Sequence, residues 1–147
     1  MEIICDSVEQ TMELGKKLGE NLTRGMVLTL NGDLGAGKTT FTKGIAKGLG
    51  IEKVVSSPTF TILKQYQGRL NLNHFDAYRL EGQDIDLGFE DLIYSDDVSI
   101  IEWSGFIEEI LPEQRLDIAI EYLGDNSRRF NFNPRGQKYL ELVEVLI

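Results

Sequence analysis

A glycine-rich segment, Gly32-Asp-Leu-Gly-Ala-Gly-Lys-Thr39, has the spacing of a Walker A phosphate-binding loop. Its glycines let the backbone wrap closely, so that successive N–H groups point at phosphate oxygens. In such a loop Lys38 reaches the β- and γ-phosphates, and the Thr39 hydroxyl coordinates Mg²⁺. The segment therefore predicts a nucleoside triphosphate site, with contacts from Asp33, Leu34, Gly35, Ala36, Gly37, Lys38, Thr39 and Thr40.

The alternative is a glycine-rich turn that matches the loop by chance. The flanking residues argue against it, because 26–30 form an apolar run typical of a buried strand. Residues 38–49 have the pattern of a helix that Gly50 ends. A helix starting at the loop points its partly positive N-terminus at the same anion, so we favour the phosphate site.

Two acidic residues follow apolar segments, where a phosphate-transferring site is expected to place its carboxylates. Asp76 ends the run at residues 70–75, and Glu102 ends the run at residues 98–101. One carboxylate can hold Mg²⁺, usually through water, while the other orients a nucleophilic water. The alternative is an acid exposed at a strand end without a chemical role. Lys38 and these two acids are the candidate catalytic residues.

Three further features give weaker signals. In the segment Ser-Pro-Thr-Phe-Thr at residues 57–61, Thr59 and Thr61 are placed to sense the γ-phosphate, although Ser-Pro-Thr is also common in turns. His74 is the only histidine, and a lone histidine is more often structural. Trp103 is expected in the core, although its place beside the second acid leaves a ligand-stacking role open.

Several classes of nucleotide enzyme lack their usual motifs here. A GTPase would carry an Asn-Lys-x-Asp guanine reader, and no such string occurs. A nucleoside or nucleotide kinase would need a substrate insert and an arginine-rich lid, whereas the only adjacent arginines, Arg128 and Arg129, fall in a late predicted strand. An ATPase or ATP-driven switch remains, with a small-molecule kinase and a non-catalytic nucleotide switch as alternatives.

Size and charge limit the function further. The 147 residues fit one domain, 1–147, and the net charge of −9 repels nucleic acid, so we expect any contact with nucleic acid to be indirect, through a partner. No apolar run approaches the roughly 18 residues of a membrane span. Cys5, the only cysteine, cannot form an internal disulfide. These features predict a cytoplasmic protein that does not enter a membrane.

The remaining pattern predicts the elements that position these side chains. Strands are expected at residues 2–5, 26–30, 59–66, 69–76, 98–101, 116–122 and 128–133, with hairpin turns at 67–68 and 124–126. Helices are expected at residues 8–22 with Ser7 as the N-cap, and at 38–49, 86–93 and 137–146. The predicted fold is a single-domain α/β P-loop NTPase with a mixed, partly antiparallel sheet flanked by helices.

Five separated motifs together resemble one family. They are GDLGAGKTTFTKG from Gly32, SPTFT from Ser57, HFDAYRL from His74, LGFED from Leu87 and IIEW from Ile100. In type and order they are similar to TsaE (formerly YjeE), the small P-loop ATPase of bacterial threonylcarbamoyladenosine (t6A) tRNA modification. The resemblance spans residues 7–129, and the set is far more specific than a Walker A loop alone.

The resemblance implies a function that the residues alone do not. Family members hydrolyse ATP weakly on their own and associate with TsaB and TsaD. That pair transfers a threonylcarbamoyl group to adenosine 37 of tRNAs reading codons that begin with A. The ATPase is required for the modification to cycle but does not perform the transfer. A small chain then suffices, because its output is a conformational effect on a partner.

The resemblance also implies roles for particular residues. Lys38 and the loop would hold phosphates, Thr39 and Glu102 would hold Mg²⁺, and Asp76 would be the catalytic carboxylate. The expected sensing and nucleotide-proximal residues are Thr59, Thr61, Trp103, Thr11 and Arg128. The chain departs from the family at Ala77, where a larger aliphatic is usual, and at Leu92, where tyrosine is common. Residues 104–112 carry no functional inference.

Overall fold

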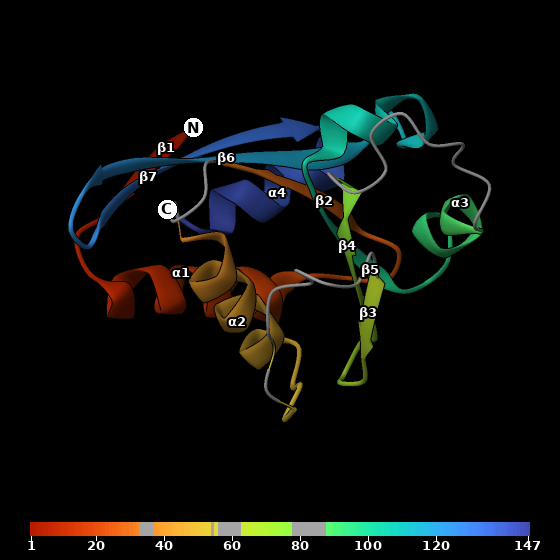
Figure 1. Ribbon diagram of the computed structural model, residues 1–147, viewed down its shortest axis with the longest axis horizontal. Helices are drawn as coiled ribbons and strands as arrows, with labels where there is room; N and C mark the ends of the chain where they lie inside the picture. Colours follow the sequence, from red (N-terminus) through yellow and green to blue (C-terminus); the bar gives the residue numbers. More distant parts are fainter. Residues whose placement is uncertain (33–36, 54, 56–62, 78–87) are drawn as a thin grey trace.

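A twisted mixed sheet forms the centre of the molecule (Figure 1). The computed structural model describes residues 1–32, 37–53, 55, 63–77 and 88–147. Within them, seven strands follow the order β1-β7-β6-β2-β5-β4-β3. Their bounds are β1 Glu2–Cys5, β2 Val27–Asn31, β3 Leu63–Tyr66, β4 Leu72–Asp76, β5 Val98–Glu102, β6 Arg115–Gly124 and β7 Ser127–Arg135. Strands β4, β5, β2 and β6 are parallel, and β1, β7 and β3 pair antiparallel, which confirms the predicted mixed sheet.

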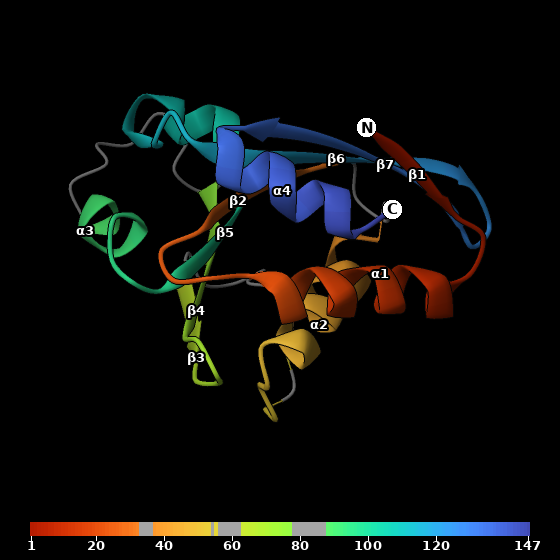
Figure 2. The ribbon, with the colours of Figure 1, turned by 180° about the vertical axis from the view of Figure 1, so that it is seen from behind.

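Helices cover both faces of this sheet. Helices α1 (Val8–Asn21), α2 (Lys38–Gly48) and α4 (Gln137–Val145) lie on one face (Figure 2). Their apolar side chains pack on Leu28, Leu30 and Ile100. The short helix α3 (Phe89–Ile93) and the 3₁₀ helix η2 (Ser104–Ile110) pack on Val27, Phe75 and Ile101. Alternate strand residues thus serve opposite cores, as side-chain alternation along a strand requires. Among the described residues no helix is both long and apolar enough to span a bilayer.

Helices α1 and α2 touch through their backbones. A Cβ atom added at Gly19 of α1 would lie 2.2 Å from the Ile45 carbonyl oxygen, and one at Gly48 of α2 would lie 2.3 Å from the Lys16 carbonyl oxygen. Only glycine permits this approach, because real Cβ atoms do not come so close to backbone. Helices α1 and α2 therefore form one tightly joined pair on this face of the sheet. Ser7 caps α1 as predicted, since its side chain accepts a hydrogen bond from the Gln10 N–H.

The predicted two-residue turn at 67–68 is wrong. Strand β3 ends at Tyr66, and β4 begins at Leu72, so residues 67–71 connect a longer hairpin. Within this connection, Arg69 forms hydrogen bonds with the C-terminal ends of α1 and α2. The Arg69 N–H donates to the Leu49 carbonyl (2.6 Å), and the Arg69 guanidinium donates to the carbonyls of Gly19 (2.9 Å) and Leu22 (3.3 Å). The last carbonyls of a helix have no partner within the helix. The hydrogen bonds that Arg69 donates to them outweigh the local preference for a two-residue turn.

Other predicted bounds agree with the structure to within a few residues. Within the described part of the chain, the helix predicted at 86–93 is α3, which begins at Phe89, and the strand predicted from 69 begins at Leu72. The sequence pattern did not reveal η2, because its Ser-Gly-Phe start has no helical periodicity. The predicted strand residues 59–62 lie outside the described residues.

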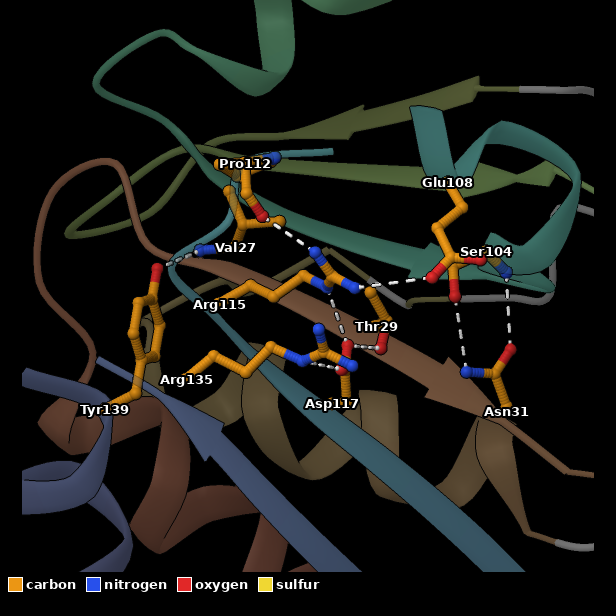
Figure 3. Close-up of polar contacts among 10 residues, drawn as sticks. All are labelled: Val27, Thr29, Asn31, Ser104, Glu108, Pro112, Arg115, Asp117, Arg135 and Tyr139. Carbon is orange, nitrogen blue, oxygen red and sulfur yellow. Dashed lines mark hydrogen bonds and ion pairs between the residues drawn. The ribbon is translucent and has the colours of Figure 1, made fainter. Parts of the chain in front are cut away.

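Tyr139 of α4 ties this helix to the central strand (Figure 3). Its buried hydroxyl accepts a hydrogen bond from the Val27 N–H at 2.8 Å, and burial raises the pKa of this hydroxyl. We expect Tyr139→Phe to lower the free energy of unfolding by about 1–3 kcal/mol, because it leaves a buried backbone N–H without a partner. Urea denaturation of both proteins measures the difference. An unchanged denaturation midpoint would contradict the importance of this bond, and Tyr94→Phe, at an exposed tyrosine, is the matched control.

Candidate functional site

The ends of three parallel strands bring the predicted residues together at one edge of the sheet. Strand β2 ends at Asn31, β4 at Asp76 and β5 at Glu102. Glu102 pairs in register with Leu30 on one side and with Asp76 on the other. Carboxyl ends of neighbouring parallel strands meet at the same edge, which is where α/β proteins place their ligands. Glu102 therefore adjoins the strand that leads into the glycine-rich loop, and Asp76 lies one strand further along the same edge.

Lys38 stands at the centre of this edge. It opens helix α2 and is only 7% exposed. Its Nζ donates to the Gly32 carbonyl at 2.7 Å, lies 3.8 Å from Glu102 Oε1 and sits 4.0 Å from the centre of the Trp103 ring. A carbonyl, a carboxylate and an aromatic face are all favourable surroundings for a buried ammonium. The structure thus joins three residues that the sequence had singled out separately.

The first turn of α2 is suited to an anion. Its N-cap, Gly37, has φ of +98° and, as a glycine, has no side chain that could cap the helix. Thr39 and Thr40 lie half-buried in that turn. Unpaired N–H groups and the helix dipole together favour negative charge at this position. The loop residues Asp33, Leu34, Gly35 and Ala36 lie outside the described residues.

Glu102 divides its two carboxylate oxygens between two basic side chains. Oε2 lies 2.6 Å from His74 Nε2, and Oε1 faces the Lys38 ammonium. His74 is 1% exposed and Glu102 is 7% exposed, so water does not compete strongly for these contacts. The sequence reasoning treated His74 as structural and missed this pair. The available signal was the alternation of His74 and Asp76 along one strand, which puts both on the face that carries Glu102.

Trp103 has a backbone conformation that is rare for its residue type. Its φ of +59° and ψ of +46° are left-handed, and it is the only non-glycine residue with positive φ among those described. Such a conformation costs roughly 1–2 kcal/mol for an L-residue with a side chain. It turns the chain sharply between β5 and η2, so that the indole ring lies over the Lys38 ammonium. Backbone strain of this kind is concentrated at functional sites.

Side chains anchor both ends of the segment that follows Trp103 (Figure 3). At its start, Asn31 Nδ2 donates to Ser104 Oγ (3.3 Å), and the Ser104 N–H donates to Asn31 Oδ1 (3.2 Å). At its end, Arg115 donates to the Pro112 carbonyl (2.8 Å) and to Asp117 (2.9 Å). Asn31 is the last residue of β2, so this pair ties the end of that strand to the turn at Trp103.

Asp76 adjoins Glu102 but is more accessible. It is half-buried at the end of β4, and its register partner on β5 is Glu102. The two acids therefore occupy neighbouring positions on the same face, at the edge where α2 begins. A pair of carboxylates with different exposure suits a division of labour between holding a cation and orienting water. The assignment of each role stays a prediction.

The hairpin of β6 and β7 approaches the same loop from another side. A Cβ atom at Gly37 would lie 3.4 Å from Arg128 Nε, so the Arg128 side chain rests against the loop end. Its guanidinium also stacks 4.7 Å from the centre of the Tyr122 ring, a residue that the sequence did not single out. Arg128 thus adjoins the site, as the family resemblance implied, and its contact with nucleotide stays a prediction.

The structure does not bring every predicted residue into this cluster. Thr11 is 2% exposed on α1, where its side chain forms a hydrogen bond with Cys5 that partly offsets the rise in the thiol's pKa caused by burial. Its contact with nucleotide stays a prediction. Thr59 and Thr61 lie outside the described residues, so the sensing loop is a prediction as well.

The arrangement fits a phosphate and a magnesium ion. The Lys38 ammonium and the N-terminus of α2 lie together where phosphate oxygens need donors. Among the described residues no group of three or more His, Cys, Asp or Glu side chains forms a complete metal cage. Mg²⁺ does not require one, because it usually takes one or two protein oxygens plus phosphate and water. The Thr39 hydroxyl and the two carboxylates are oxygen ligands of this kind.

Comparison with known proteins gives one family throughout. A family model described as "Threonylcarbamoyl adenosine biosynthesis protein TsaE" matches residues 5–130. The TsaE protein of Bacillus subtilis is 48% identical over 139 residues, covering 94% of this chain and 88% of the relative. That of Treponema pallidum is 41% identical, covering 87% of this chain and 96% of the relative. The crystal structure of Bacillus subtilis YdiB matches with a TM-score of 0.87 and 42% identity, covering 99% of this chain and 93% of that chain.

Proposed function

Because the chain belongs to the TsaE family of threonylcarbamoyl adenosine biosynthesis proteins, we propose that it serves threonylcarbamoylation of tRNA as an ATP-hydrolysing subunit. Its product would be the modified adenosine 37 of tRNAs that read codons beginning with A. The observation that carries the proposal is the contact of Lys38 with Glu102 and Trp103 at the end of the glycine-rich loop. These residues lie within the part of the chain that the family model matches.

The residues at the sheet edge support ATP and Mg²⁺ as the bound groups. Lys38 leaves the Gly32 carbonyl for the terminal phosphates, which offer a stronger acceptor because they are charged. The Thr39 hydroxyl and Glu102 hold Mg²⁺, which neutralises phosphate charge when bound. Asp76, the more exposed acid, orients the attacking water. The other residues assigned to the site are Thr11, Thr40, Thr59, Thr61, Trp103 and Arg128, together with the loop backbone.

The partners in this proposal are TsaB and TsaD, which perform the transfer. A net charge of −9 supports an indirect relation to tRNA, because an acidic surface repels a polyphosphate backbone. ATP hydrolysis would then change the state of the partner pair, and the chain itself would need no site for a second substrate.

The test is ATP hydrolysis by the purified protein, alone and with TsaB and TsaD from the same organism. We expect weak turnover alone and strong stimulation by the pair. Asp76→Asn should lower stimulated turnover by about 10²–10⁴-fold, the usual contribution of a general base. Asp91→Asn changes an exposed acid on α3 and should leave turnover unchanged.

Three outcomes would contradict the proposal. Turnover that ignores the partner pair but rises with an added metabolite would indicate a small-molecule kinase. Turnover unaffected by Asp76→Asn would mean that the site binds nucleotide as a switch without this carboxylate in the chemistry. Full t6A content in cells that lack the protein would remove the tRNA role itself.

A further inference from the structure

We propose that His74 is a positioning residue that fixes the Glu102 carboxylate for metal binding. The inference rests on the proposed function, because it concerns how one residue of that site holds its metal ligand. Its starting point is the 2.6 Å contact between His74 Nε2 and Glu102 Oε2. Neither the phosphate loop nor the chemistry assigned to the two acids uses His74.

The direction of this hydrogen bond follows from the chemistry of the pair. An ionised carboxylate only accepts hydrogen bonds, so the ring must carry its proton on Nε2 and donate it. The ring's other nitrogen, Nδ1, is buried and has no hydrogen-bond partner among the described residues. A neutral ring with Nε2–H leaves only a lone pair unsatisfied there. The same ring could not also donate from Nδ1 without burying an unpaired N–H.

Packing alone does not explain a histidine at this position. On the same face of the sheet it lies beside two fully buried apolar residues, Leu72 along β4 and Ile100 on β5, as well as Lys64 on β3 and Asp76 along β4. An aliphatic side chain would fill this place without an unsatisfied nitrogen, since a buried polar atom without a partner costs about 1–3 kcal/mol. The hydrogen bond between His74 Nε2 and Glu102 explains why a histidine occupies this position.

The hydrogen bond determines which carboxylate oxygen is available. With Oε2 committed to His74, Oε1 is turned toward Lys38, at the edge where α2 begins. The carboxylate cannot rotate about its last bond without breaking a buried contact. Groups that hydrogen-bond a metal ligand orient it, and losing them typically costs 10–100-fold in metal affinity. His74 therefore affects Mg²⁺ binding through Glu102 without touching the metal.

Two amide substitutions separate this role from general packing. At position 74 the side-chain amide nitrogen of glutamine would lie near the position of histidine Nε2 and could donate to Glu102. The asparagine side chain is too short to bring its amide nitrogen there. We would titrate Mg²⁺ into each protein with ADP bound, and follow the fluorescence of Trp103. Trp103 is the only tryptophan and adjoins Lys38. ADP affinity measured with chelator present reports the rest of the site.

We expect His74→Asn to raise the Mg²⁺ concentration for half-saturation by about 10–100-fold and to leave metal-free ADP affinity unchanged. His74→Gln should stay within about threefold of the wild type, because the donor is restored. Equal Mg²⁺ affinity in His74→Asn and the wild type would overturn the inference. So would equal losses in the two variants, since a donor at the Nε2 position would then not matter.

A third variant covers the case in which His74→Asn does not fold. His74→Leu can pack against Leu72 and Ile100, so it is expected to fold and to bind ADP, but to show the same loss of Mg²⁺ affinity as His74→Asn. Wild-type Mg²⁺ affinity in this variant would again overturn the inference. Failure of the proposed function looks different, because the wild-type protein would then show no Mg²⁺-dependent change with bound ADP at all.

Discussion

Lys38→Ala is expected to lower ATP turnover by about 10²–10³-fold, the usual cost of removing one preorganised donor from developing charge. Lys38 is the buried cation at the loop and the only side chain that the structure places against Gly32, Glu102 and Trp103 together within the described residues. The variant should also lose its thermal response to nucleotide. Mg-ATP at 100 times its dissociation constant should stabilise the wild type by about 2.7 kcal/mol. Assays of ATP hydrolysis measure the first effect, and melting curves with and without Mg-ATP measure the second.

Lys43→Ala is the matched control for this substitution. Lys43 lies in the same helix, carries the same charge and is exposed, so its removal should change neither turnover nor the response to Mg-ATP. If both lysine variants lose activity equally, the effect is one of net charge or helix stability. If Lys38→Ala keeps its response to Mg-ATP, the ammonium is not a principal phosphate contact.

Gly48→Ala is expected to destabilise the fold by about 3 kcal/mol, which lowers Tm by about 6–12 °C. The new Cβ would lie 2.3 Å from the Lys16 carbonyl oxygen and 2.6 Å from the Glu20 nitrogen, and both are backbone atoms of α1. A flexible side chain could move aside, but backbone can yield only if the whole helix shifts. The better helix propensity of alanine, worth about 1 kcal/mol, does not offset this overlap. Calorimetry gives the change in Tm.

Gly105→Ala is the control for Gly48→Ala. Among the described residues, no atom outside its chain neighbours lies within 4 Å of the Cβ position at Gly105, and its φ is not in the left-handed range. The same chemical change should therefore leave Tm within about 1 °C of the wild type, as surface substitutions usually do. Equal losses in the two variants would mean that the α1–α2 contact is not what makes glycine necessary at position 48.

The elements predicted well are those whose signals are local. The apolar runs at 26–30 and 98–101, the Ser7 cap and the periodic residues at the end of the chain each determine their structure within a few neighbours. The Walker A spacing likewise identified Lys38 without knowledge of the sheet. These signals need no information about which strands pair, so a single sequence carries them.

The features that were missed depend on contacts between residues far apart in the sequence. His74 and Glu102 are 28 positions apart, and only the parallel register of β4 and β5 brings them into contact. The connection at 67–71 is set by carbonyls at the ends of α1 and α2, which no local turn pattern contains. The left-handed turn at Trp103 is held by Asn31 and Ser104, which are 73 positions apart. Each of these is a tertiary contact that outweighs a local preference.

The close contact of α1 and α2 has a mechanical consequence. Where side chains separate two helices, rotamer changes can absorb a small displacement of one helix, but no side chains intervene at Gly19 and Gly48. The pair can move only as one rigid body, because sliding would force backbone atoms into each other. A displacement at the start of α2, where phosphate would bind, is then expected to move α1 as well, including exposed residues such as Glu13. The glycines thus couple the movement of α2 to that of α1.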